Sequence, residues 1–352
     1  MKKILRSKKA KKAEQPLGRI TNETVAEHRE RILAGGRRFK YPVQYARHRL
    51  VFNTVIISTV ALVLVLVFVW WQLYIQQNSS SFFYRITRVV PVPVASVDSQ
   101  SVTYSHYLMR YRLQAHYLEK KEGVNLQAPD SKSQVDYMKR KALNEAIADS
   151  YAKKLAKEKN ITVTTKQVED ALELQRKSSN GTASKDVYDA SVLDLYNLTS
   201  SEVREMTERS LLRKEVAYAI DTTAVRQRDE VVAQLKTESD FDKIVASIDK
   251  IGSAKVQAGV VPLVPSSNRD YGLAAAAAQL EVGKVSDVFR STNGDGYYVV
   301  KLLQKDNDNR VSYAYIKIPL TIFDNTLKQL NKDGRIDEYI SIPEDNAQPL
   351  AQ

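Results

Sequence analysis

The chain has 352 residues, of which 43% are hydrophobic and 27% charged, and this length allows two or three folded domains. It has no cysteine and only four histidines, which excludes disulfides, thiolate nucleophiles and zinc sites built on sulfur. Residues 1–50 hold 15 of the 53 Lys and Arg residues and 4 of the 41 Asp and Glu residues, so the basic charge belongs to an N-terminal tail. This distribution disfavours a nucleic-acid-binding domain as the main part of the chain.

A long apolar stretch follows the tail. Residues 50–84 carry no charged side chain, and the 25 residues from Val51 to Ile75 are almost all apolar. In a helix, this stretch is roughly 37 Å long, which exceeds the ~30 Å hydrocarbon core of a bilayer. Trp70 and Trp71 lie near its end, where headgroups favour aromatic rings. The stretch is too long and too far from the N-terminus for a cleavable signal peptide, so we predict a transmembrane signal-anchor helix over residues 50–75.

The charge asymmetry around this helix predicts its orientation. Basic residues concentrate before the apolar stretch, which predicts that residues 1–49 form a cytoplasmic tail and that the later domains are extracytoplasmic, in a single-pass protein of the cell membrane. Within the tail we expect disorder over residues 2–12 and a helix from Asn22 to Ala34 that stops at Gly35. We expect the basic tail to contact anionic lipid headgroups; contact with nucleic acid or the ribosome is the alternative.

The predicted extracytoplasmic part begins with a linker over residues 76–94, because its prolines disfavour a helix there. A short strand, a turn at Asp98-Ser99 and a helix from Thr103 follow. Apolar residues at spacings of three and four predict further helices, over residues 132–158, from Thr165, over 184–196 and from the capping box Thr199–Glu202. Residues 95–221 are therefore predicted to form an all-α domain.

The pattern changes to mixed helices and strands over residues 222–332. Strands are predicted at Val260–Val264, Val285–Phe289, Tyr297–Leu303 and Val311–Ile318, and the turn of residues 293–296 indicates a hairpin. We predict a small α+β domain with an antiparallel sheet, followed by a frayed tail over residues 333–352. The sequence has no nucleophile elbow, phosphate-binding loop or metal-ligand cluster, so no cofactor and no metal are expected.

The helical part resembles the SurA/PrsA/PpiD group of extracytoplasmic foldases. Three stretches carry the resemblance to their SurA-like N-terminal region: VASVDSQSVTYSHY from Val94, KALNEAIADSYAKKLAKEKNITVTTKQVEDAL from Lys141, and SEVREMTERSLLRKEVA from Ser201. The resemblance implies a helical chaperone region that binds unfolded or nascent exported polypeptides.

The α+β part resembles a degenerate parvulin-type (PpiC) peptidyl-prolyl isomerase domain. Leu280-Glu-Val-Gly-Lys-Val-Ser286 fits a parvulin motif in full, and segments starting at Phe241, Ala258 and Gly296 fit others in part. The strand that opens such a domain is absent before residue 223, while a strand of that type appears as Val311–Ile318. The sequence leaves two readings open, a circularly permuted domain or an added edge strand.

The resemblance also places the candidate site. Both histidines of the parvulin pattern are absent; Tyr298 stands at one of these positions and, if the domain is permuted, Tyr315 stands at the other. We expect Tyr298, Tyr315, Phe241 and Tyr271 to line a shared cleft. We therefore expect weak or absent isomerase activity. An active enzyme stays open as an alternative, because the reaction needs only an apolar pocket that stabilises the twisted amide and no nucleophile.

Three functions remain open from the sequence. The first is a membrane-anchored extracytoplasmic chaperone that binds unfolded polypeptides. The second is an active parvulin-type peptidyl-prolyl cis-trans isomerase with a rebuilt pocket. The third is an envelope scaffold or secretion-complex subunit with one dedicated partner.

Overall fold

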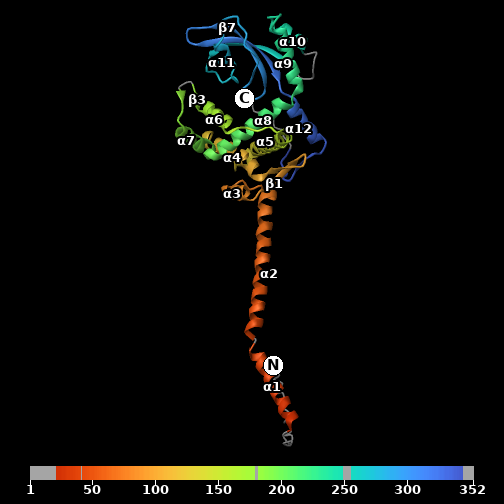
Figure 1. Cartoon of the computed structure of the whole chain (residues 1–352). Helices are drawn as coiled ribbons and strands as arrows, with labels where there is room; N and C mark the ends of the chain where they lie inside the picture. Colours follow the sequence, from red (N-terminus) through yellow and green to blue (C-terminus); the bar gives the residue numbers. More distant parts are fainter. Residues whose placement is uncertain (1–20, 41, 179–180, 249–254, 344–352) are drawn as a thin grey trace. The chain divides into compact units, whose positions relative to one another are not determined.

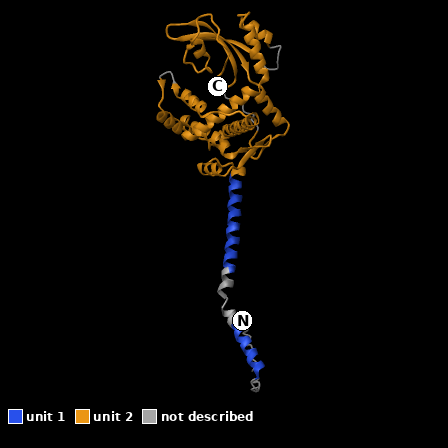
Figure 2. Cartoon of the chain, viewed as in Figure 1, with its two compact units in different colours: residues 1–72 blue, residues 73–352 orange. Residues whose placement is uncertain are grey.

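The computed structural model describes residues 21–40, 42–178, 181–248 and 255–343. The chain divides into an N-terminal unit, residues 1–72, and a C-terminal unit, residues 73–352, which Figure 2 distinguishes by colour. The domains predicted at 95–221 and 222–332 therefore both lie within the C-terminal unit.

The described part of the N-terminal unit is helical. It consists of α1 (Asn22–Lys40) and α2 (Pro42–Trp70), and a π-helical turn η1 (Trp71–Ile75) extends α2 into the C-terminal unit. Among the described residues, one helix, His48–Ile75, is long and apolar enough to cross a membrane. The side chains of its most apolar 18-residue window are not buried, whereas Leu73 in its last turn is buried.

One predicted boundary in the tail is wrong. The helix expected to stop at Gly35 continues to Lys40, because glycine lowers helix propensity by only about 1 kcal/mol and does not by itself end a helix. The segment predicted to be disordered, residues 2–12, lies outside the described residues.

The predicted linker, residues 76–94, contains a helix, α3 (Ser81–Val89), so this prediction is also wrong in part. Phe83, Tyr84 and Thr87 on one face of α3 are buried in the C-terminal unit. The prolines that disfavour a helix come only after α3, where the chain becomes extended and enters the first strand.

The helical region is built from one short and five longer helices. These are α4 (Tyr104–Lys121), the 3-10 turn η2 (Pro129–Ser131), α5 (Lys132–Lys159), α6 (Thr165–Arg176), α7 (Lys185–Tyr196) and α8 (Ser200–Ile220). The capping box predicted at Thr199–Glu202 is confirmed, since the Thr199 hydroxyl and the Glu202 carboxylate each accept from the other residue's backbone N–H. Two short strands, β3 (Lys177–Ser178) and β4 (Gly181–Thr182), pair antiparallel between α6 and α7.

A three-stranded sheet corrects two predictions. The predicted short strand is β1 (Pro93–Val97); after the turn at Asp98-Ser99 it pairs with a strand that was not predicted, β2 (Gln100–Thr103), and β9 (Ile336–Glu338) pairs antiparallel with the other edge of β1. The helical region is therefore not all-α. Residues 333–343 also do not form a frayed tail. Strand β9 supplies hydrogen-bond partners to β1, and Ile340 and Ile342 are buried.

The second sheet lies in the α+β part. Its strands are β5 (Gln257–Pro265), β6 (Phe289–Arg290), β7 (Gly296–Lys305) and β8 (Arg310–Pro319), in the antiparallel order β5-β8-β7-β6. The helices of this part are α9 (Thr222–Gln234), α10 (Phe241–Ile248), α11 (Leu273–Ala278) and α12 (Ile322–Lys332). The central position of β8 beside β7 is confirmed, with Val300 paired to Tyr315. An added edge strand is therefore wrong.

Helices pack against both faces of this sheet (Figure 1). Alternate residues of β7 and β8 point to opposite faces. Tyr297 and Ile316 belong to the core that α9 and α10 cover, whereas Tyr298 and Tyr313 belong to the core that α11 covers.

The helical region is joined tightly to this sheet. The Tyr218 hydroxyl on α8 donates to the Gly296 carbonyl at 2.7 Å, and the Lys214 ammonium donates to the Thr292 carbonyl at 2.8 Å. Arg290 forms an ion pair with Glu215 at 3.0 Å. These contacts explain why residues 73–352 form one unit.

Candidate functional site

Two of the four candidate side chains lie together on the α11 face of the sheet. The ring centroids of Tyr298 and Tyr315 are 6.2 Å apart, and Phe289 stacks on the other side of Tyr298 at 6.3 Å. Tyr313 lies on the same face, one pair further along β8. This group, Tyr298, Tyr313, Tyr315 and Phe289, is called the aromatic face below.

The other two candidates are placed differently. Tyr271 precedes α11, is about half exposed and contributes to the electrostatic surroundings of Tyr298, so it borders the aromatic face. Phe241 is buried in the core on the opposite face, together with Ile244 and Ile248 of α10. The expectation that Phe241 shares a cleft with Tyr298 is therefore wrong, because the inward side of α10 packs on the other side of the sheet.

Carboxylates fix the tyrosine hydroxyls. The Tyr298 hydroxyl donates to Oδ2 of Asp295 at 2.9 Å, and the Lys317 ammonium donates to the same atom at 2.5 Å. The Tyr313 hydroxyl donates to Oδ2 of Asp270 at 2.6 Å. Burial and the adjacent carboxylates raise the pKa of both tyrosines, so both hydroxyls remain protonated at neutral pH.

Asp295 is the ionised partner in this group. Burial would raise its pKa, but the hydrogen bonds from Lys317, Ser291 and Tyr298 outweigh burial and lower the pKa below its ordinary value. The negative charge of Asp295 is thus neutralised within the face and is not available as a general base.

Tyr315 occupies the space next to strand β5. A methyl group added to Gly259 would lie 2.7 Å from the ring carbon and hydroxyl of Tyr315, so the ring lies directly against the Gly259 backbone. Only glycine permits this contact. The Tyr315 ring therefore covers β5 at Gly259.

The described residues contain no group of His, Asp and Glu side chains suited to hold a metal ion. Hydroxyls that donate to carboxylates and an ion-paired lysine offer no activated nucleophile. The aromatic face can contact an apolar segment, but the hydroxyls of Tyr298 and Tyr313 already donate to carboxylates.

A cavity of about 1050 Å³ lies between helices α5 and α8 and the segment formed by α12 and β9. Residues of α5, α8, α12 and β9 line this groove, named here the α5–α12 groove. Its apolar lining is formed by Tyr137, Ile147, Ala148, Leu327 and Ile336, and its polar lining by Arg140, Lys141, Asn144, Glu145, Arg213, Asp324, Lys328, Asn331 and Glu338.

Ion pairs hold the walls of the α5–α12 groove. Arg140 on α5 donates to Glu338 of β9 at 2.6 Å and also to the carbonyl of Ile342. Arg213 on α8 pairs with Asp149 behind the groove at 3.0 Å. The lining is thus partly apolar with charges of both signs, and its volume exceeds that of many small-molecule sites.

Sequence reasoning missed the α5–α12 groove. Its lining comes from segments about 180 residues apart, and two of its residues, Ile336 and Glu338, belong to the stretch predicted as a frayed tail. The signal was the pair Ile340 and Ile342 with Ile336, an apolar alternation within that stretch. Lys317 was a detectable partner of the tyrosines, since Tyr313, Tyr315 and Lys317 lie two residues apart along β8 and therefore share one face.

The comparisons with known proteins bear on the helical region. Residues 46–217 match the family model of the SurA-like N-terminal domain, which is just under half of the chain. This match supports a SurA-like N-terminal domain over these residues. No curated protein matches the chain. The matched segment includes α5 and Arg213 of the α5–α12 groove, whereas α12 and β9 lie beyond it.

Proposed function

We propose that this protein is a membrane-anchored, extracytoplasmic chaperone that binds unfolded or nascent exported polypeptides. The observation that carries the proposal is the SurA-like N-terminal domain over residues 46–217, which is consistent with a chaperone-type role. The same match extends into the apolar helix His48–Ile75, which supports an anchor joined directly to the chaperone region.

The α5–α12 groove is the proposed binding site for the client. Its apolar residues, such as Tyr137 and Leu327, can cover side chains that a client exposes while it is unfolded. Its polar rim can bind the client backbone without a fixed sequence, and a groove with mixed lining suits many clients.

The first test concerns client binding in the groove. In the full chain, Leu327→Asp is expected to weaken suppression of client aggregation, with an affinity loss of about tenfold, because it introduces a charge where an apolar contact is lost. The matched control is Leu174→Asp on α6, where the leucine is exposed and outside the groove. Aggregation of several unrelated clients is followed by light scattering. Equal activity of both variants, with unchanged thermal midpoints, contradicts a client site in the groove.

For the α+β part we propose a circularly permuted, parvulin-like domain with weak or absent isomerase activity. The support is β8, which lies beside β7 and is joined to it by a short turn, as expected if the first and last strands of a parvulin are connected directly. In place of the two histidines stand Tyr298, whose hydroxyl bonds to Asp295, and Tyr315, whose ring covers Gly259.

This proposal predicts that the full chain does not accelerate prolyl isomerisation in a protease-coupled peptide assay. An isomerase must lower a barrier of about 20 kcal/mol by stabilising the twisted amide, and the two parvulin-type histidines are replaced by Tyr298, whose hydroxyl is bonded to Asp295, and by Tyr315, whose ring lies against Gly259. The control is Tyr298→Phe, which removes the hydroxyl alone. An acceleration by the natural chain that Tyr298→Phe abolishes would establish the enzyme alternative.

The proposed topology has residues 1–49 in the cytoplasm and residues 76–352 outside. The charge asymmetry around the apolar helix supports this orientation. Protease added to intact cells is expected to degrade the C-terminal part and to leave the tail, as read by tags at both ends. If the C-terminal tag is protected in intact cells and lost after lysis, the C-terminal part lies inside and the proposed orientation is wrong.

A further inference from the structure

Helix α3 has two unlike faces. Phe83, Tyr84 and Thr87 point into the C-terminal unit and are buried. On the other face, Phe82 is 65% exposed and Val89 is 83% exposed, seven residues apart and thus on the same side of the helix. A helix on a water-exposed surface would normally carry polar side chains at these positions.

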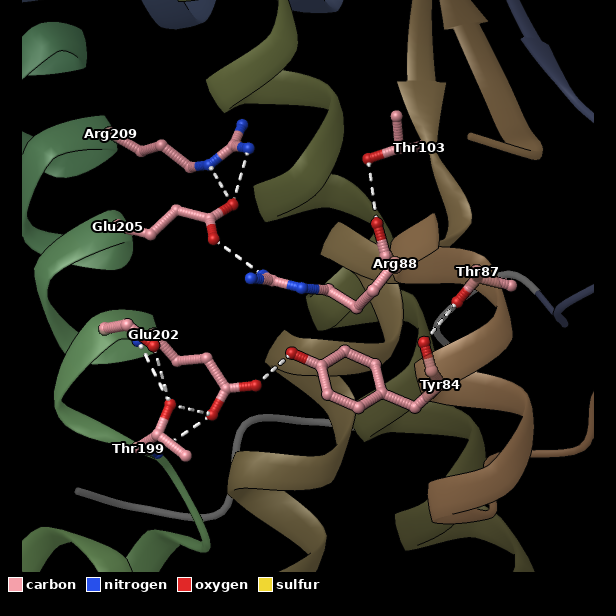
Figure 3. Close-up of polar contacts among 10 residues, drawn as sticks. Tyr84, Thr87, Arg88, Thr103, Thr199, Glu202, Glu205 and Arg209 are labelled. Carbon is pink, nitrogen blue, oxygen red and sulfur yellow. Dashed lines mark hydrogen bonds and ion pairs between the residues drawn. The ribbon is translucent and has the colours of Figure 1, made fainter. Parts of the chain in front are cut away.

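Polar contacts fix α3 in this orientation (Figure 3). The Tyr84 hydroxyl donates to the Glu202 carboxylate of α8, and the Arg88 guanidinium pairs with Glu205 of α8 at 2.6 Å. Arg112 of α4 donates to the Ser81 hydroxyl at 2.9 Å. Because both ends of α3 are bound to neighbouring helices, Phe82 and Val89 cannot turn inward without breaking these contacts.

The chain connects α3 closely to the apolar helix. Ile75, the last residue of that helix, precedes Phe82 by seven residues, which span at most about 25 Å. The last turn of the apolar helix is itself held in the C-terminal unit: Leu73 is buried, and its carbonyl accepts a hydrogen bond from Tyr104 at 2.6 Å. Five residues, 76–80, lie between the two helices.

The charge of this segment is one-sided. No Asp or Glu occurs between Glu30 and Asp98, while Arg85 is exposed on α3 between Phe82 and Val89. An aromatic ring and an aliphatic side chain with an arginine between them fit the boundary between headgroups and acyl chains, where the guanidinium reaches the phosphates.

We propose that the exposed face of α3, formed by Phe82, Arg85 and Val89, lies on the outer surface of the membrane and inserts Phe82 and Val89 among the lipid headgroups. This inference rests on the proposed membrane anchor and adds a second contact with the bilayer. The contact fixes the C-terminal unit against the lipid surface at the exit of the apolar helix.

The test uses the absence of cysteine from the chain. Single variants Phe82→Cys, Val89→Cys and Val260→Cys of the full chain are labelled with an environment-sensitive fluorophore and reconstituted in vesicles of phosphatidylcholine and phosphatidylglycerol. Val260 is the matched control, since it is a valine exposed by 67% on β5. The sheet that contains β5 lies at the opposite end of the C-terminal unit from α3 (Figure 1).

The expected result is emission at shorter wavelength for the labels at 82 and 89, and several-fold stronger quenching by lipids spin-labelled near the headgroup than for the label at 260. Labels at 82 and 89 that behave like the control, on a chain that resists alkaline extraction, overturn the contact of α3 and leave the anchor intact. A chain that alkaline extraction removes overturns the anchor itself. A shift to shorter wavelength without lipid quenching indicates a protein neighbour and also overturns the proposal.

Discussion

Replacement of Asp149 by Asn is expected to lower the free energy of unfolding of the C-terminal unit by about 3–5 kcal/mol, because it leaves buried cations without their counter-charge. The Asp149 side chain is fully buried on α5. Its carboxylate lies 2.7 Å from the Arg110 guanidinium and 3.0 Å from that of Arg213, with His106 at 3.1 Å. Asparagine has the same shape but no charge, so the loss measures the electrostatic contribution.

The measurement is urea unfolding of the full chain in detergent. The control is Asp170→Asn, which removes a carboxylate from an exposed pair with Lys166 on α6 and should change stability by less than about 1 kcal/mol. If both variants unfold at the same urea concentration, the buried pairs contribute no more than a surface pair.

This cluster also predicts how stability depends on pH. Burial raises the pKa of Asp149, but His106, Arg213 and Arg110 outweigh burial and hold the pKa at about 2. A carboxylate with a lowered pKa stabilises the fold above its ordinary pKa, and this contribution is lost as the pH falls from about 4 toward 2. Burial lowers the pKa of His106, so its contribution is lost as the pH falls below about 6.5. Asp149→Asn should remove the lower of these two transitions.

The second large effect is expected for Asp221→Ala, at about 3–4 kcal/mol, because this one carboxylate caps two helices. Asp221 is fully buried between α8 and α9. Its Oδ1 accepts the Ala224 N–H of α9 at 2.8 Å, and its Oδ2 accepts the N–H groups of Thr321 and Ile322 at the start of α12, at 2.7 and 3.1 Å. Alanine leaves the buried Ala224 donor and the two part-buried donors of α12 without this acceptor.

Thermal unfolding of the full chain measures this loss. Ser184→Ala is the matched control, because the Ser184 hydroxyl caps only α7, at an exposed position, and should cost about 1 kcal/mol. The loss of stability for Asp221→Asn should lie between those for Asp221→Ala and Ser184→Ala, since the amide oxygen of asparagine can still accept from the N-terminus of one helix. A loss for Asp221→Ala no larger than for Ser184→Ala would mean that α12 is held by its packing alone.

Local features of this protein were predictable from the sequence because they depend on neighbouring residues. The apolar helix ending at Ile75 follows from a continuous run of apolar side chains, and the helix starts at Tyr104 and Ser200 follow from spacing and caps. The side-chain period of two along β8 likewise puts Tyr313, Tyr315 and Lys317 on one face.

The tertiary structure decided everything that joins distant segments. Sequence patterns placed Phe241 with Tyr298, but a helix can pack on either face of a sheet, and the packing of α10 put Phe241 on the opposite one. A short stretch such as β9 is too brief to be predicted as a strand, since it is stabilised only by pairing with β1, about 240 residues earlier. The same pairing places β9 beside α5 and so completes the α5–α12 groove. The groove therefore depends on a contact between segments from opposite ends of the C-terminal unit.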